Sequence, residues 1–111
     1  NPARRTLNET KLTARSHIMF DLNIMSVGGG DAKRKVSENI IESIKYAKLT
    51  KSKIFGIVGY NGGYTKKNAD CCIRIPLVDK KLITPYTEAY QAVVWHCIVS
   101  HPMLQENKTK W

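Results

Sequence analysis

Three short apolar segments alternate with amphipathic segments along the chain. Residues 17–25 are apolar apart from Asp21 and Asn23, residues 53–59 form an almost continuous apolar run, and residues 71–75 form a third run that ends at Pro76. Short apolar runs that are bounded by turn residues predict buried β-strands. We therefore expect one strand in each of these three segments.

The segments between them have the spacing of helices. Ser37 is a typical N-cap residue, and after it apolar residues recur on one helical face at Ile40, Ile41, Ile44 and Ala47. This spacing predicts a helix over 38–49. Residues 65–69 predict a short helical turn.

A final helix is expected to begin with Thr84 as its cap and Pro85 at its first position, and to end near Ser100. Its core-facing stripe is expected to consist of Tyr86, Ala89, Tyr90, Val93, Val94 and Cys97.

The order strand, helix, strand, helix, strand, helix indicates right-handed βαβ units and an α/β fold with a parallel sheet. Such sheets usually contain about four to six strands, and only three are predicted here. We therefore expect a sheet covered by helices on both faces, with further strands missing on the N-terminal side. Residues 1–16 are expected to form a basic lead-in.

Composition narrows the class of protein. The chain has 111 residues, 18 Lys or Arg against 9 Asp or Glu, and a formal net charge of +9. This length allows one domain at most. No segment has the ~20 apolar residues of a membrane-spanning helix, and the start of the chain does not resemble a secretory signal. We therefore expect a cytoplasmic protein without a membrane partner.

The three cysteines are Cys71, Cys72 and Cys97, without the paired spacing of a zinc finger. An odd number of this kind argues against a disulfide framework and favours free thiols. The basic charge would suit nucleic acid, but the Lys and Arg residues are spread along the chain without interleaved aromatic residues. Nucleic acid is therefore disfavoured as a partner.

The first candidate site follows the first predicted strand. Ser26 enters a glycine-rich turn with Gly28 and Gly29, and Ser37 and Asn39 open the next helix. This arrangement gathers hydroxyls, backbone N–H groups and a helix N-terminus, which together favour a phosphate. The sequence matches neither GxxxxGK[ST] nor GxGxxG, so no nucleotide cofactor is expected. A plain turn with a capped helix remains the alternative.

The second candidate lies on the final helix, where Glu88, Ala92 and His96 are spaced four residues apart. A carboxylate and an imidazole around a small residue could act as general acid and base or bind a divalent metal. The alternative is a solvent-facing Glu88 and a histidine at an interface.

The third candidate is the glycine-rich loop after the second predicted strand, with Tyr60 and Thr65 as substrate contacts. Because ligands bind beyond the carboxyl ends of parallel strands, this loop is expected to face the Ser26 loop. Its glycines could also serve only as turn formers.

Three motifs together resemble a known family. They are the strand that ends in Ser26 with its glycine-rich loop, the segment KIFGIVGYNGGYTKKNADCCIRIP, and the final helix TEAYQAVVWHCIVSHP. In this combination the chain is similar to the C-terminal half of a sugar isomerase (SIS) domain. The resemblance implies a three-layer α/β/α fold of the flavodoxin-like kind that is truncated at its N-terminus, with residues 17–111 as the C-terminal half of the domain. The nearest branch is the phosphoheptose isomerases, which act on sedoheptulose 7-phosphate.

The resemblance implies an aldose–ketose isomerase acting on a phosphorylated sugar, or a regulatory SIS module that binds a phosphosugar without turning it over. Ser26 and Ser37 stand where the family binds the sugar phosphate. His96 stands at the position of a catalytic histidine that is also a metal ligand, and Glu88 stands where the family usually has Gln. Zinc or another divalent metal and a homodimer or homotetramer are therefore implied.

The sequence also departs from the family. The segment GGGDAKRKVS is longer than the family's compact phosphate loop, and no counterpart is present of the first phosphate loop or of the early helix that carries His and Glu. The chain alone is therefore expected to lack a complete isomerase site.

Overall fold

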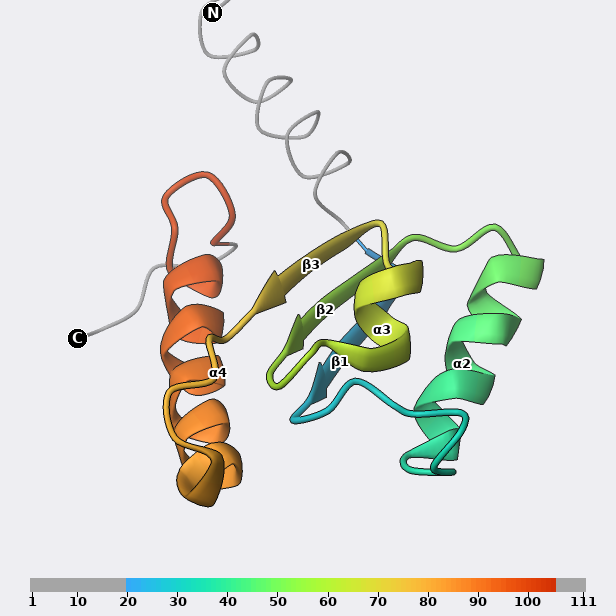
Figure 1. The fold of residues 1–111 in the computed structure, drawn as a ribbon. Helices are drawn as coiled ribbons and strands as arrows, with labels where there is room; N and C mark the ends of the chain where they lie inside the picture. The colour runs from blue at the N-terminus through green and yellow to red at the C-terminus, as the bar shows by residue number, and fades with distance from the viewer. Residues whose placement is uncertain (1–19, 106–111) are drawn as a thin grey trace, which may run out of the picture. The chain divides into compact units, whose positions relative to one another are not determined.

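The computed structural model describes residues 20–105 and contains a three-stranded parallel sheet (Figure 1). The strands are β1 (Leu22–Ser26), β2 (Ile54–Val58) and β3 (Cys71–Arg74), in the spatial order β1-β2-β3. The helices are α2 (Glu38–Leu49), α3 (Gly63–Asn68) and α4 (Ile83–Val99), with a 3₁₀ turn over Lys80–Leu82 before α4. The predicted α/β class is confirmed.

The chain divides into two compact units. Residues 20–92 form the unit that contains the sheet, and residues 93–105 are the described part of the other. The predicted basic lead-in over 1–16 and the first residues of the predicted strand, 17–19, lie outside the described residues.

The core lies between the sheet and α2. Ile24 of β1, Ile54 of β2, and Ile44 and Ala47 of α2 are buried against one another. Figure 1 shows α2 and α3 on the same side of the sheet, and both helices contact its strands. The predicted apolar face of α2 is thus confirmed, with Ile40 packed at its edge.

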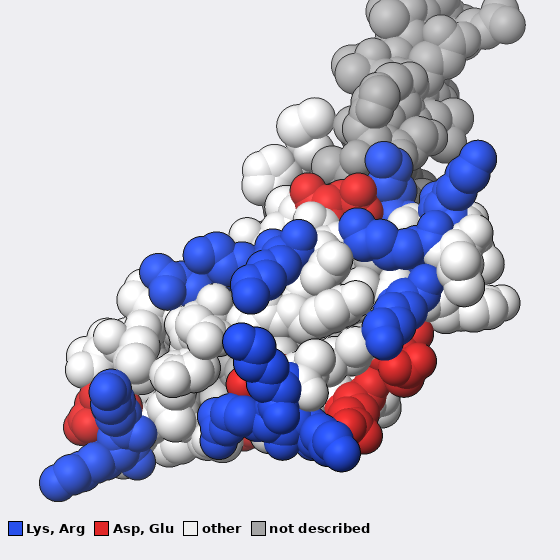
Figure 2. All heavy atoms as spheres, turned by 45° about the vertical axis from the view of Figure 1, so that its right-hand side comes forward, with Lys and Arg blue, Asp and Glu red and all other residues white. Residues whose placement is uncertain are grey.

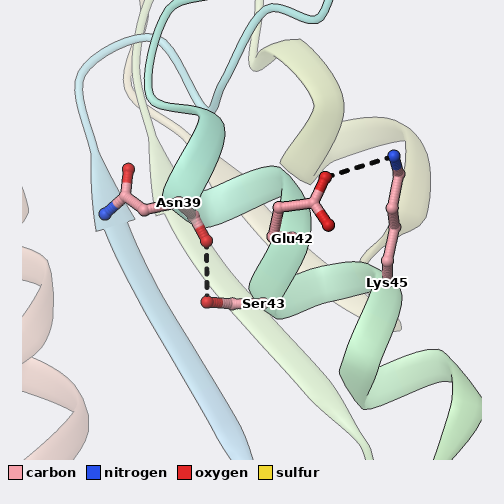
Figure 3. Close-up of polar contacts among 4 residues, drawn as sticks. All are labelled: Asn39, Glu42, Ser43 and Lys45. Atoms are coloured by element: carbon pink, nitrogen blue, oxygen red, sulfur yellow. Dashed lines mark hydrogen bonds and ion pairs between the residues drawn. The ribbon is translucent and has the colours of Figure 1, made fainter.

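The outer face of α2 is polar. Lys45 Nζ lies 3.3 Å from Glu42 Oε1, and Ser43 Oγ donates to the Asn39 carbonyl at 2.8 Å (Figure 3). Both contacts join residues one turn apart, so they stabilise the helix locally and by a few tenths of a kcal/mol.

The first strand is shorter than predicted. Phe20 and Asp21 precede β1. The Asp21 amide donates to the Lys53 carbonyl at 2.9 Å, and Asp21 Oδ2 accepts from the Lys53 amide at 2.8 Å. The Asp21 carboxylate therefore takes the Lys53 amide at the point where β1 begins to pair with β2, inside the segment 17–25 that was predicted to be one strand.

The start of the last helix was also predicted wrongly. Asp79, not Thr84, is the capping residue, since Asp79 Oδ1 accepts from the Lys81 amide at 2.9 Å. The 3₁₀ turn continues directly into α4, whose first residue is Ile83. Pro85 is tolerated at the third position because the first amides of a helix have no acceptor within it.

The predicted core stripe of α4 is wrong as well. Tyr90 and Val93 are 47% and 55% exposed, and Ala89 and Cys97 are exposed too. The buried residues of α4 are Thr87 and Gln91.

Gln91 joins α4 to the sheet through its amide. Its Nε2 donates to the Ser26 carbonyl at 3.0 Å and to the Ile57 carbonyl at 2.7 Å, which lie at the carboxyl ends of β1 and β2. A buried amide with two good acceptors avoids the cost of an unpaired polar group. This one side chain, in the middle of α4, therefore attaches the helix to the ends of two strands.

Replacing Gln91 with Leu should destabilise the fold by about 1–3 kcal/mol, because two strand-end carbonyls lose their shared donor. The free energy of unfolding is measured by urea denaturation. Glu88→Leu on the exposed side of the same helix is the control and should change it by less than about 0.5 kcal/mol. Equal stabilities of the two variants would contradict the role assigned to Gln91.

Candidate functional site

The loops after β1 and β2 are interlocked at the carboxyl edge of the sheet. Tyr64 N donates to the Gly30 carbonyl at 2.8 Å, and Thr65 donates to the Gly29 carbonyl from both its amide (3.0 Å) and its hydroxyl (2.7 Å). The predicted adjacency of the two glycine-rich loops is confirmed. Thr65 is fully buried, so it holds the loops together and leaves no hydroxyl exposed for a substrate.

Glycine is required where the two loops cross. Gly29 has φ +72°, and a side chain there would overlap the Gly62 carbonyl. Gly63 has φ +53°, and a side chain there would overlap the carbonyls of Gly28 and Gly30. Only residues without Cβ allow the backbones to approach this closely.

Ser26, Gly28 and Gly29 form one tight turn. Ser26 Oγ accepts from the Gly29 amide at 3.0 Å, so the hydroxyl shapes the loop. Gly29 is buried, whereas an added Cβ at Gly28 would meet nothing within 4 Å. Within residues 20–105 the Gly28 amide donates to no acceptor, so it is a backbone donor that a ligand could use.

The chain then makes a second turn before α2. Asp31 and Val36 exchange two backbone hydrogen bonds of 3.0 Å, and Asp31 Oδ1 accepts from the amides of Lys33 (3.0 Å) and Arg34 (3.1 Å). These contacts order the turn in which Lys33, Arg34 and Lys35 lie.

Ser37 occupies the predicted N-cap position but does not cap α2 with its side chain. Its φ is +53°, in the left-handed region, and its hydroxyl makes no capping hydrogen bond. Its carbonyl lies 3.6 Å from the position that a Cβ on Gly30 would take. The Ser37 backbone therefore borders the glycine loop, and its hydroxyl has no partner among the described residues.

Asn39 is exposed in the first turn of α2, and its carbonyl accepts from Ser43 (Figure 3). The structure gives its side chain no hydrogen bond within the described chain. It is therefore the most peripheral of the five predicted phosphate-binding residues.

A hollow of about 420 Å³ lies between the two turns. Its walls include Gly30, Asp31 and Lys33 from the first loop and Asn61, Tyr64 and Lys67 from the second loop and α3. Figure 2 shows Lys and Arg side chains over the face that carries α2 and α3, with carboxylates in small separate groups. Sequence reasoning did not anticipate this hollow, because it arises from the crossing of two loops about 30 residues apart.

Glu88 and His96 lie on α4, both exposed. The Trp95 and His96 rings are in edge contact, with centroids 4.1 Å apart. The two candidate residues belong to different compact units, Glu88 to 20–92 and His96 to the second.

These two residues do not by themselves suit a shared metal. Helical metal ligands such as those of HExxH are one turn apart, whereas eight residues of helix rise about 12 Å. No cluster of three His, Cys, Asp or Glu side chains suitable for a metal occurs among residues 20–105.

The cysteines are free thiols in the structure. Burial raises the pKa of the Cys72 thiol above its ordinary value, the neighbouring Cys71 adds to the rise, and Lys66 opposes it. Cys72 is therefore protonated at neutral pH and is not an activated nucleophile.

The sequence did not indicate that Gln91, Thr65 and Thr87 hold the loops and α4 in place at the carboxyl edge of the sheet. Thr87 is buried, and its methyl and hydroxyl lie where a Cβ on Gly59 would stand. A polar residue in an otherwise apolar helix was the available signal for Gln91 and Thr87.

No protein-family model, curated protein or solved structure matches the chain. Among the described residues, no helix has the length and apolar character needed to cross a membrane. The resemblance to sugar isomerase domains therefore rests on the motifs in the sequence.

Gly29→Ala should lower the free energy of unfolding by at least about 2 kcal/mol. The alanine would have to adopt a left-handed backbone conformation, and its Cβ would clash with the Gly62 carbonyl. Gly28→Ala is the matched control, since its Cβ would enter open space, and it should be nearly neutral. Urea denaturation of both variants measures the difference. If Gly29→Ala were as stable as Gly28→Ala, the interlocked loops would not be a structural constraint.

Proposed function

We propose that this chain is the C-terminal half of a three-layer, SIS-type domain that binds a phosphorylated sugar, and that the whole protein is an aldose–ketose isomerase. Sedoheptulose 7-phosphate represents the substrate class. The phosphate is bound by the turn from Ser26 to Gly29 and by Ser37 at the start of α2, with Asn39 at the rim.

The observation that carries this proposal is the set of donors left available at the carboxyl edge of the sheet. Within the described chain, the Gly28 amide and the Ser37 hydroxyl make no hydrogen bond, and the first amides of α2 have no acceptor inside the helix. These groups suit the oxygens of a phosphate, and the helix dipole favours its charge.

Backbone strain in the same loops supports the proposal. Three of the four residues other than glycine with left-handed φ values among residues 20–105 are Lys35, Ser37 and Tyr60, at 55°, 53° and 48°; the fourth, Lys51, follows α2. Such conformations each cost about 1 kcal/mol or more in residues other than glycine, and they cluster at functional sites. All three lie in the two loops that meet at the carboxyl edge.

The chemistry proposed is proton transfer through an enediol. A base removes the proton from the carbon next to the sugar carbonyl, and an acid protonates the carbonyl oxygen. Holding the phosphate fixes the sugar for this transfer. His96 is proposed as one of these groups because an imidazole can both accept and donate a proton, and Glu88 is proposed as the other.

The second candidate function is a regulatory module that binds the phosphosugar without turnover. The observation in its favour is that Glu88 and His96 are both exposed and two helical turns apart. In either function we propose a cytoplasmic homodimer or homotetramer, which the exposed Tyr90 and Val93 of α4 support.

Ser37→Ala should weaken the binding of a sugar phosphate about tenfold, since one hydrogen bond to a charged oxygen is lost. Its stability should be unchanged because the hydroxyl makes no capping bond. Titration calorimetry with sedoheptulose 7-phosphate measures the affinity. Ser43→Ala is the control, since its hydroxyl bonds the helix backbone, and it should bind normally. Equal affinities of the two variants would remove Ser37 from the site.

His96→Ala distinguishes the enzyme from the regulator. In an isomerase, turnover by the intact protein should fall by about 10²–10⁴-fold, as is typical for the loss of a general acid or base, with phosphosugar affinity retained. Isomerisation is followed by the appearance of the aldose product. Absence of turnover in the unmodified intact protein, with phosphosugar still bound, would establish the regulator instead.

A further inference from the structure

The C-terminal end of α2 carries two apolar side chains that the fold leaves in solvent. Tyr46 and Leu49 are 69% and 83% exposed and lie about one turn apart on the helix. Leu49 is the most exposed large hydrophobic residue among residues 20–105. A single exposed leucine is common on protein surfaces, but these two side chains lie within a segment that has only one sign of charge.

That segment is cationic. Its four lysines are all exposed: Lys45, Lys48, Lys51 and Lys53. Residues 45–53 contain no Asp or Glu. Among the described residues, the one ion pair of these lysines joins Lys45 to the exposed Glu42 at 3.3 Å (Figure 3). The helix end therefore presents net positive charge beside exposed apolar surface.

The backbone carbonyls at this helix end already have partners. The Tyr46 carbonyl accepts from the Thr50 amide at 3.1 Å, and the Ala47 carbonyl accepts from the Ser52 amide at 2.8 Å. Thr50 Oγ1 also donates to both carbonyls, at 3.2 and 3.1 Å. Because unpaired carbonyls are costly to bring near hydrocarbon, a helix end closed in this way can approach an apolar phase at low cost.

A partner that suits this end of α2 offers negative charge and an apolar phase at one surface. An anionic bilayer has both, since its headgroups attract lysine, its hydrocarbon accepts leucine, and tyrosine is favoured at the boundary between them. Nucleic acid would attract the lysines but offers no apolar phase for Leu49. A folded protein partner typically covers about 800 Å² of surface, whereas a fluid lipid surface can adapt to two protruding side chains.

We propose that the C-terminal end of α2 binds reversibly to the surface of an anionic membrane. Leu49 enters the edge of the hydrocarbon, Tyr46 lies at the level of the headgroups, and Lys48 and Lys51 contact the lipid phosphates and carboxylates. The expectation of no membrane partner was based on the lack of a membrane-spanning segment, and this surface contacts a bilayer without crossing it. The inference does not depend on the proposed sugar-phosphate site.

The test is co-sedimentation of the 111-residue chain with lipid vesicles. Vesicles of phosphatidylcholine and phosphatidylserine in equal amounts should bind the chain, and vesicles of phosphatidylcholine alone should not. Lys48→Gln should weaken binding to the mixed vesicles about fivefold, as expected for one lysine near an anionic surface. Leu49→Gln should weaken it about tenfold, because the apolar contact is lost. Both residues are exposed, so urea denaturation should show unchanged stability.

Val78→Gln and Lys80→Gln are the matched controls. Val78 is also 69% exposed, and Lys80 is an exposed cation close to it in the sequence, with Asp79 between them. Both variants should bind the mixed vesicles as the unmodified chain does.

Three results would overturn the inference. The first is no binding to the mixed vesicles. The second is binding that Leu49→Gln leaves unchanged, or that Val78→Gln weakens equally, because the attraction would then be general to the basic surface. The third is binding to a DNA duplex and not to vesicles, weakened by Lys48→Gln but not by Leu49→Gln, which would identify nucleic acid as the partner.

Discussion

The close approach of two glycine-rich backbones is the constraint on which the rest of the structure depends. Gly29 and Gly63 allow the loop after β1 to lie directly against the loop after β2, and Thr65 ties them together from inside. Because the strands are parallel, both loops leave the same edge of the sheet. The start of α3, the turn at Ser26 and the hollow beside Lys33 all take their positions from this crossing.

The same sheet edge is fixed a second time by Gln91. Its amide donates to the carbonyls of Ser26, the last residue of β1, and of Ile57, the next-to-last residue of β2, so α4 is attached close to where the two loops begin. A hydrophobic residue there would leave these carbonyls without their donor and could not select one orientation, since apolar contacts are not directional. Two hydrogen bonds to carbonyls of different strands give the helix a defined register.

The strands and α2 could be predicted because their signals are local. The apolar run before Gly59 and the spacing of Ile41, Ile44 and Ala47 depend on nearest neighbours alone. The orientation of α4 could not, because apolar residues surround most of that helix and spacing does not select a face. The glycine-rich turn after β1 could be predicted as a segment. Which of its donors is already used, as at Ser26, depends on loop geometry that spacing does not show.

The positions of the charged residues matter more for binding than the net charge of the chain. Scattered exposed lysines create a field that salt screens within about 10 Å, and such a field attracts any anion. The backbones of Lys33 and Lys67 are fixed beside the hollow, because Asp31 accepts from the Lys33 amide and α3, which carries Lys67, is joined to the Gly29 carbonyl through Thr65. The contact that closes the sheet edge therefore also places the backbone of Lys67 at the hollow. Selectivity for one anion over another requires such fixed positions, and the charge of +9 cannot provide it alone.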